Sequence, residues 1–290
     1  MSVPCILFMA ARSFTLPGAS GGLLFRKMSS RRQMDHLERT ASIYRQDRVY
    51  PARVCGIMDE SETVKRLRLA VHPDFTFRAG QWVDVFIPGM EKVGGFSVCS
   101  SPGLLQREGV IELAVKYTQH PPAHWIHTKC TMDSHVAMRV GGNLFFDPLR
   151  SNPCVDLLLM AGGVGINPLY SILLHAADLL QQNPANVGRG YDIGSTHLCY
   201  SAKNAQEKTI IDVCKEFPEK FSCDFHITAQ TADIDQELQP SMNRGRLSEG
   251  ELRRRVDPNT TLLPVWPSTH DKERGPDPAK FRPIPGQDTV

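Results

Sequence analysis

A glycine-rich turn between an apolar run and a helix carries the clearest chemistry in this chain. Residues 157–161 read as a buried strand, three glycines fall within the next four positions, and Pro168 suits the first turn of a following helix. Such a turn exposes backbone N–H groups and the positive end of a helix dipole, which favour a pyrophosphate. Because the spacing is not G-x-G-x-x-G, an ordinary strand-to-helix turn is the alternative. The candidate phosphate-binding residues are Gly162, Gly163, Val164, Gly165, Ile166 and Asn167.

The first half of the chain predicts an all-β domain. Residues 49–148 read as short strands broken by turns, and several of these strands alternate apolar with polar residues. Period-2 alternation at short, repeated spacing is typical of an antiparallel sandwich or barrel. The expected strands are 54–57, 64–71, 82–87, 96–99, 111–117 and 134–140, with a single helix at 124–130.

The second half predicts an α/β domain with a parallel sheet. The expected strands 155–160, 197–200 and 221–229 alternate with the helices 169–182 and 206–217. A ligand of such a sheet sits beyond the carboxyl ends of its strands, which is where the glycine turn falls. A β domain followed by a nucleotide-binding α/β domain therefore predicts a two-cofactor arrangement with a cleft between the halves.

Composition and charge exclude several classes of function. The 290 residues are 41% hydrophobic and 22% charged, which fits a globular protein of two domains. A net charge of +2 does not suggest nucleic-acid binding, and no apolar run reaches the roughly 18 residues of a membrane span. The eight cysteines form no C-x-x-C pair, so we expect scattered reduced thiols. The nearby His120, His124, His127 and Cys130 fit no zinc spacing, so no metal is expected there.

Residues 1–34 have a different character from the rest of the chain. They are rich in Arg and Ser and hold no acidic residue before Asp35. This composition is typical of a mitochondrial transit peptide, and a disordered N-terminal tail is the alternative. We therefore expect a mitochondrial protein whose fold begins after this segment.

The order of the two halves, with its particular motifs, resembles the ferredoxin–NADP reductase-like flavoprotein superfamily. The anchors are residues 80–83, 95–102 and 140–142, together with the glycine turn. The resemblance implies a flavin-binding antiparallel β-barrel at 48–150 and an NAD(P)-binding α/β domain at 151–262. It implies NAD(H) or NADP(H) and FAD or FMN as cofactors, with a hydride passing from the nicotinamide to the flavin. The electron acceptor beyond the flavin stays unknown.

The resemblance also implies roles for individual residues. An Arg-x-Tyr-Ser strand binds the flavin in this superfamily, and the corresponding residues here are 94–97. Phe96 is implied to pack on the flavin ring, and Ser97 is implied to be the catalytic residue that hydrogen-bonds the reactive edge. In the α/β half, Lys203 is implied to meet a phosphate or ribose of the dinucleotide, with an exposed loop lysine as the alternative.

Two departures from the superfamily pattern concern the flavin phosphates. Gly94 stands where the superfamily has the arginine that neutralises a phosphate, a contact that contributes on the order of 1.5–3 kcal/mol. The second phosphate element, Gly-x-x-Ser before a short helix, is replaced by residues 121–124, which lack the hydroxyl. Helix N-terminal amides, His124 or Lys116 could take over part of this role.

The C-terminal segment departs most sharply from the superfamily. Relatives continue with a Cys-Gly strand ending, a helix and a final strand, whereas residues 263–290 hold several prolines among charged residues. This pattern predicts a Pro-rich disordered tail and an incomplete α/β domain, and we interpret it as an alternatively spliced ending. The expected function is an NAD(P)H-dependent flavin oxidoreductase. The alternative is a catalytically inactive nucleotide-binding or scaffold protein of the same fold.

Overall fold

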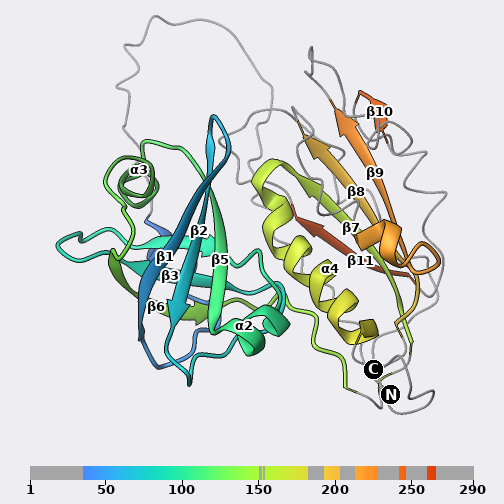
Figure 1. The fold of residues 1–290 in the computed structure, drawn as a ribbon, viewed down its shortest axis with the longest axis horizontal. Helices are drawn as coiled ribbons and strands as arrows, with labels where there is room; N and C mark the ends of the chain where they lie inside the picture. The colour runs from blue at the N-terminus through green and yellow to red at the C-terminus, as the bar shows by residue number, and fades with distance from the viewer. Residues whose placement is uncertain are drawn as a thin grey trace, which may run out of the picture.

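The computed structural model describes residues 35–149, 152, 154–181, 193–202, 213–227, 242–245 and 260–265. These residues form two sheet-based domains, an antiparallel barrel first and a parallel sheet second (Figure 1). No helix in this described part is long and apolar enough to span a membrane. The two-domain fold class predicted from the sequence is confirmed.

Six antiparallel strands build the first domain, in the order β4-β3-β6-β1-β2-β5. The two ends of this order meet where the Cys99 N–H donates to the Glu112 carbonyl at 2.9 Å, so the sheet closes into a barrel. Sequence alternation in β2 places Leu67 and Leu69 in the core. The strands are β1 (Tyr50–Ser61), β2 (Val64–Val71), β3 (Trp82–Phe86), β4 (Gly94–Ser97), β5 (Val110–Lys116) and β6 (His135–Gly141).

Two helices interrupt the strands of the barrel where the sequence predicted one. The expected helix is α3 (Pro121–Thr128), which begins before the predicted residue 124. α2 (Pro102–Glu108) was not expected, and the prediction of a single helix was wrong. Its signals are short-range: the Ser101 hydroxyl accepts from the Leu104 N–H at 3.1 Å, and Gly109 ends the helix with a left-handed φ of 66°. A helix of 7 residues is too short to show a helical period in its apolar residues.

The chain before β1 forms a strap, residues 35–48, which lies against the barrel. It begins with the single-turn helix α1 (His36–Arg39). Further along, the Gln46 N–H donates to the Val140 carbonyl at 2.9 Å, and the Tyr44 carbonyl accepts from the Gly142 N–H at 3.0 Å. The barrel domain therefore includes residues that precede the predicted boundary at 48.

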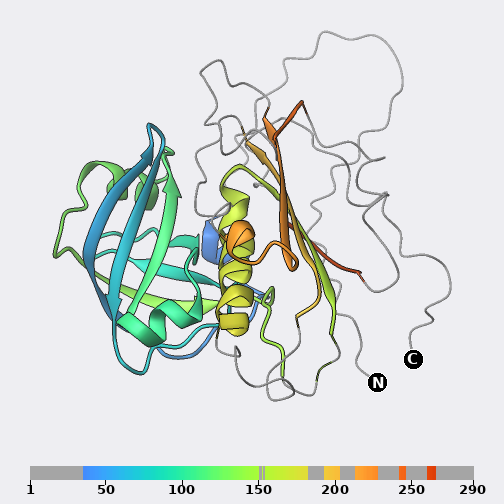
Figure 2. The same ribbon diagram turned by 45° about the vertical axis from the view of Figure 1, so that its right-hand side comes forward.

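Five parallel strands form the described part of the second domain, in the order β10-β9-β8-β7-β11, and α4 (Ile166–Gln181) packs on one face of them (Figure 2). β11 pairs with β7 as far as Val265, so the prediction of a tail from residue 263 was wrong at its start. β11 is an edge strand, where Pro264 is tolerated because one side of the strand needs no ladder donor. Residues 266–290 lie outside the described residues. The strands are β7 (Asp156–Gly162), β8 (Thr196–Ala202), β9 (Phe221–Ile227), β10 (Met242–Arg244) and β11 (Thr260–Val265).

Helix α4 joins the two domains. Its Ser171 hydroxyl is buried and donates to the Ser100 carbonyl of the barrel at 2.6 Å. Near the other end of the helix, the Asp178 carboxylate accepts hydrogen bonds from the Ser101 hydroxyl and from the Arg107 guanidinium, the latter at 3.0 Å. These contacts hold the carboxyl end of β7 in a defined position beside the barrel.

Candidate functional site

The glycine turn sits at the carboxyl end of a central strand of the parallel sheet. β7 ends at Gly162, a 3-10 turn covers Gly163–Gly165, and α4 begins at Ile166. Gly163 has a φ of 50°, a left-handed conformation that glycine adopts without strain. The predicted succession of strand, turn and helix is therefore confirmed. Gly163 is exposed and Val164 is half-buried, so their backbone is open to a ligand.

Two of the candidate phosphate-binding residues face the protein. Ile166 is 5% exposed and packs in the core of the α/β domain. Asn167 is 7% exposed, and its Nδ2 donates to the Ala114 carbonyl of β5 at 2.7 Å. This hydrogen bond ties the start of α4 to the barrel, so the side chain of Asn167 positions the turn.

Strand β4 brings Ser97 towards the same place. The Cys99 N–H, two residues beyond the end of β4, donates to the Glu112 carbonyl at 2.9 Å and links this end of β4 to β5. Asn167 binds the carbonyl of Ala114 on the same strand, β5. The Ser97 hydroxyl is half-buried and accepts no hydrogen bond from any described residue. The structure therefore brings the implied catalytic serine and the glycine turn to the same strand, β5.

Phe96 lies on the opposite face of β4 from Ser97. It pairs with Val83, which is fully buried, whereas Ser97 pairs with Trp82. The Phe96 ring packs against the barrel core and covers Gly94. Its ring is thus directed into the barrel, whereas the resemblance implied a contact with the flavin ring.

Side chains fill the place implied for the flavin phosphates, between Gly94 and the start of α3. A Cβ on Gly94 would lie 2.8 Å from the Cβ of Pro122 and would overlap the ring of Phe96. The first two residues of α3 are Pro121 and Pro122, and neither has a backbone N–H to offer an anion. The residues here do not fit a flavin diphosphate, whereas the glycine turn before α4 has no proline and leaves Gly163 exposed and Val164 half-buried.

The other candidates from the sequence do not join this site. Lys203 lies outside the described residues. His127 Nε2 is 2.8 Å from the Val115 carbonyl, a contact that holds α3 on the barrel. Within the described ranges, metal-ligating atoms gather in one group, all within 4.8 Å of one another. That group lies on the parallel sheet and was not singled out from the sequence; its members are His197, Cys199 and Asp224.

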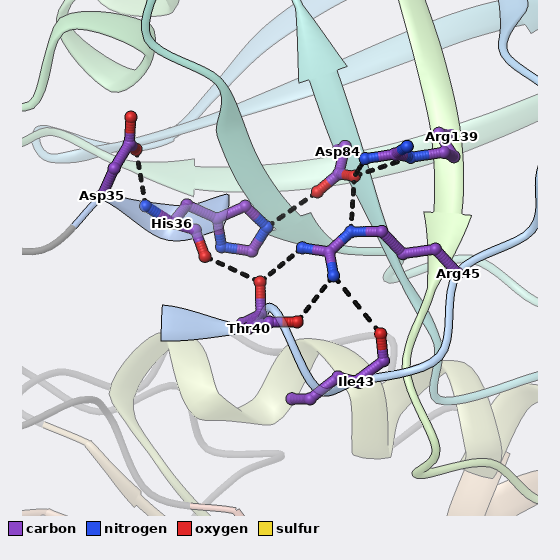
Figure 3. Close-up of polar contacts among 7 residues, drawn as sticks. All are labelled: Asp35, His36, Thr40, Ile43, Arg45, Asp84 and Arg139. Carbon is purple, nitrogen blue, oxygen red and sulfur yellow. Dashed lines mark hydrogen bonds and ion pairs between the residues drawn. The ribbon is translucent and has the colours of Figure 1, made fainter. Parts of the chain in front are cut away.

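A buried ion cluster around Asp84, which pairs with Gly95 of β4, was missed by the sequence analysis (Figure 3). Asp84 of β3 is fully buried, and its carboxylate accepts hydrogen bonds from His36 Nε2 at 2.9 Å, Arg45 Nε at 2.9 Å and Arg139 Nη2 at 2.7 Å. Burial alone would raise the pKa of Asp84, but the hydrogen bonds from these side chains and the charge of Arg45 lower it to about 2. The cluster therefore fastens the strap to the barrel with an ionised carboxylate.

The strap also brings a histidine onto the strand that carries Ser97. The His36 ring occupies the space where a Cβ on Gly95 would stand, and it packs edge-on against Trp82 with ring centroids 4.9 Å apart. Gly95 and Ser97 share one face of β4, because side chains alternate along a strand. The only sequence signals for this packing are a glycine and an acidic residue: Gly95 of β4 pairs directly with Asp84 of the neighbouring strand β3.

Comparisons with known proteins place the chain in a family. No family model matches it. It is 67% identical over 240 residues to oxidoreductase NAD-binding domain-containing protein 1 of Danio rerio, and the aligned region covers 81% of this chain and 88% of that protein. The Homo sapiens protein of the same name is 56% identical over 245 residues, covering 83% of this chain and 78% of that protein.

Solved structures match the fold. The cytochrome b5 reductase domain of Ulva prolifera nitrate reductase superposes with a TM-score of 0.57 at 15% identity, over 77% of this chain and 88% of that one. Barrel, parallel sheet and glycine turn together define a reductase fold of the ferredoxin–NADP reductase-like class. Within that class, the chain belongs to the oxidoreductase NAD-binding domain-containing protein 1 family.

Proposed function

We propose that this chain is an NAD(P)H-dependent oxidoreductase whose dinucleotide binds at the Gly163–Gly165 turn and whose acceptor, a flavin, meets it at the Ser97 edge of the barrel. The observation that carries the proposal is the hydrogen bond from Asn167 to Ala114, 2.7 Å long, which joins the turn to the strand beside Ser97. The reductase fold and the family name support the same class of chemistry. When bound, a reduced nicotinamide supplies a hydride and a flavin accepts it.

The residues of the chain bind and orient the reactants. The amides of Gly163 and Val164, which precede the positive end of α4, would hold the dinucleotide phosphates. Asn167 and Ser171 fix α4 on the barrel, so the turn cannot drift from β5. The Ser97 hydroxyl is free among the described residues to hydrogen-bond the acceptor. The main contribution of such a site to catalysis is to hold two reactants at a fixed distance and in a fixed orientation.

A binding experiment tests the dinucleotide part of the proposal. Gly163→Asp puts a carboxylate where the phosphates bind, and it should weaken NADH or NADPH by at least about 10-fold in calorimetric titrations of the full chain. Gly89→Asp is the matched control, because Gly89 also has a positive φ, 75°, and nothing within 4 Å of its Cβ position. Equal affinities in Gly163→Asp and Gly89→Asp would refute the placement of the dinucleotide.

A second candidate function is dinucleotide binding without turnover. The observation that favours it is the filled place between Gly94 and α3, which leaves the flavin phosphates without partners. Tight NADH binding with no oxidation of NADH by riboflavin, FMN, FAD or ferricyanide would support this candidate over the first.

We further propose that residues 1–34 are a transit peptide removed in mitochondria. Their composition supports import, and the contacts of the strap from residue 35 onward support removal at or before Asp35. The N-terminal sequence of the protein isolated from mitochondria tests this. An N-terminus beyond residue 48 would contradict it, because cleavage there would remove the partners of Asp84.

A further inference from the structure

We infer that a flavin enters this site as an exchangeable reactant, recognised through its ring end, and that the chain does not retain FAD by its diphosphate. The inference rests on the proposed function and names how its acceptor is held. It comes from three features that surround the place implied for the flavin phosphates: strand β4, the start of α3, and the nearby charged side chains.

Strand β4 leaves no room for a phosphate-binding side chain. Gly94 pairs with Val85, and the space above its Cα is taken by the Phe96 ring and by Pro122, whose Cβ would lie 2.8 Å from a Cβ on Gly94. An arginine at position 94 would need both neighbours to move. The lack of an arginine at position 94 is therefore part of a wider packing arrangement, in which Phe96 and Pro122 cover Gly94.

The start of α3 lacks the donors that anion-binding helices use. Pro121 and Pro122 have no backbone N–H, and the His124 N–H already donates to the His120 carbonyl at 2.9 Å. Of the first four residues, that leaves the amide of Ala123, which is 4% exposed. By contrast, α4 has a single proline in its first turn, Pro168, and its first two residues are preceded by the proline-free turn that contains Gly163 and Val164.

Three of the cations near β4 are bound to acidic residues. Arg45 and Arg139 bind Asp84, and Lys92 pairs with Asp35 at 3.2 Å. Burial lowers the pKa of His120, the residue that precedes α3, so its ring is neutral at pH 7 even with Asp35 nearby. Arg39 of the strap also acts on His120 electrostatically, so positive charge near this place comes from the strap, and neither β4 nor the first four residues of α3 contain a lysine or arginine.

The affinities of riboflavin, FMN and FAD for the full chain test the inference. Each charge-assisted phosphate contact contributes roughly 10-fold or more to affinity, so a chain without them should bind all three flavins within about 3-fold of one another. Titration followed by flavin fluorescence gives these affinities without any turnover. FAD binding at least about 30-fold tighter than riboflavin would overturn the inference, as would FAD that stays bound through dialysis. Failure of all three flavins to bind would overturn it too.

A variant expected to gain phosphate binding tests whether the prolines at the start of α3 prevent it. Pro122→Ala returns an amide N–H to the first turn of α3, so FMN and FAD should tighten several-fold relative to riboflavin. Pro102→Ala is the matched control, since Pro102 also begins a helix, α2, and it should leave the three affinities unchanged. Equal shifts in both variants would contradict the role given to α3.

Failure of this inference can be told apart from failure of the proposed function. NADH affinity is measured in the same samples by calorimetry. If NADH binds and FAD is strongly preferred over riboflavin, the exchangeable flavin is wrong and the dinucleotide site stands. If NADH does not bind, the proposed function fails whatever the flavin affinities are.

Discussion

Replacing Asp84 by Asn tests whether the buried ion cluster holds the strap on the barrel. The substitution keeps the size of the side chain and removes its charge, which faces His36, Arg45 and Arg139 at 2.7–3.0 Å. Removing one partner of a buried ion pair costs about 3–5 kcal/mol, because the opposite charges are left without compensation. The side chain of Arg139 is 26% exposed and can regain water, so we expect a loss near about 3 kcal/mol.

The lowered pKa of Asp84 expresses the same stabilisation as a dependence of stability on pH. The pKa of Asp84 falls from its ordinary 3.8 to about 2, which at roughly 1.4 kcal/mol per pH unit is about 2.5 kcal/mol. A carboxyl group with a lowered pKa in the folded state stabilises the fold above its unfolded pKa and loses that contribution as the pH falls. The wild-type chain should therefore lose about this much stability between about pH 4 and about pH 2, and Asp84→Asn should lack that part of the slope.

Urea unfolding followed by circular dichroism measures both effects. Asp74→Asn is the matched control, because Asp74 pairs with Arg48 on the surface and is 58% exposed, so its change should stay within about 0.5 kcal/mol. If Asp84→Asn unfolded within about 1 kcal/mol of the wild type at pH 7, the cluster would not hold the strap and the reasoning would fail.

Three further predictions concern the strap and the contact between Asn167 and the barrel. Deleting residues 1–34 should leave the unfolding midpoint unchanged, whereas deleting 1–48 should lower it clearly, because only the second deletion removes His36 and Arg45 from Asp84; thermal unfolding of both forms checks this. Gly95→Ala should destabilise by about 1–3 kcal/mol, since its Cβ overlaps the His36 ring; a wild-type unfolding curve would contradict it. Asn167→Leu should cost about 1–3 kcal/mol, because the buried Ala114 carbonyl loses its donor, and should weaken NADH binding through the displaced turn; unchanged NADH affinity would separate the turn from this contact.

Local sequence patterns were enough for the glycine turn and most strands. The succession from Gly162 to Pro168 is short-range, so its strand, turn and helix follow from residue types alone. Alternation in β2 likewise predicted which side chains enter the core. α2 was overlooked although Ser101 and Gly109 mark its two ends, because a short helix shows no period.

Long-range packing determined what the sequence analysis missed. The strap has no periodic pattern, and its place depends on ion pairs from His36 and Arg45 to Asp84, which follows them by 48 and 39 positions in the sequence. The loss of an arginine at Gly94 was visible, but that Phe96 and Pro122 fill the space became apparent only in the folded chain. Pro264 suggested a tail, yet an edge strand accepts it.

The most direct test of the central claim is an anaerobic mixing experiment with the full chain, NADH and excess riboflavin. The account predicts that absorbance at about 340 nm and at about 450 nm falls together, far faster than without protein, and that Gly163→Asp slows both while Gly89→Asp does not. NADH that stays reduced with both ligands bound would contradict the claim that the turn and the Ser97 edge form one hydride-transfer site.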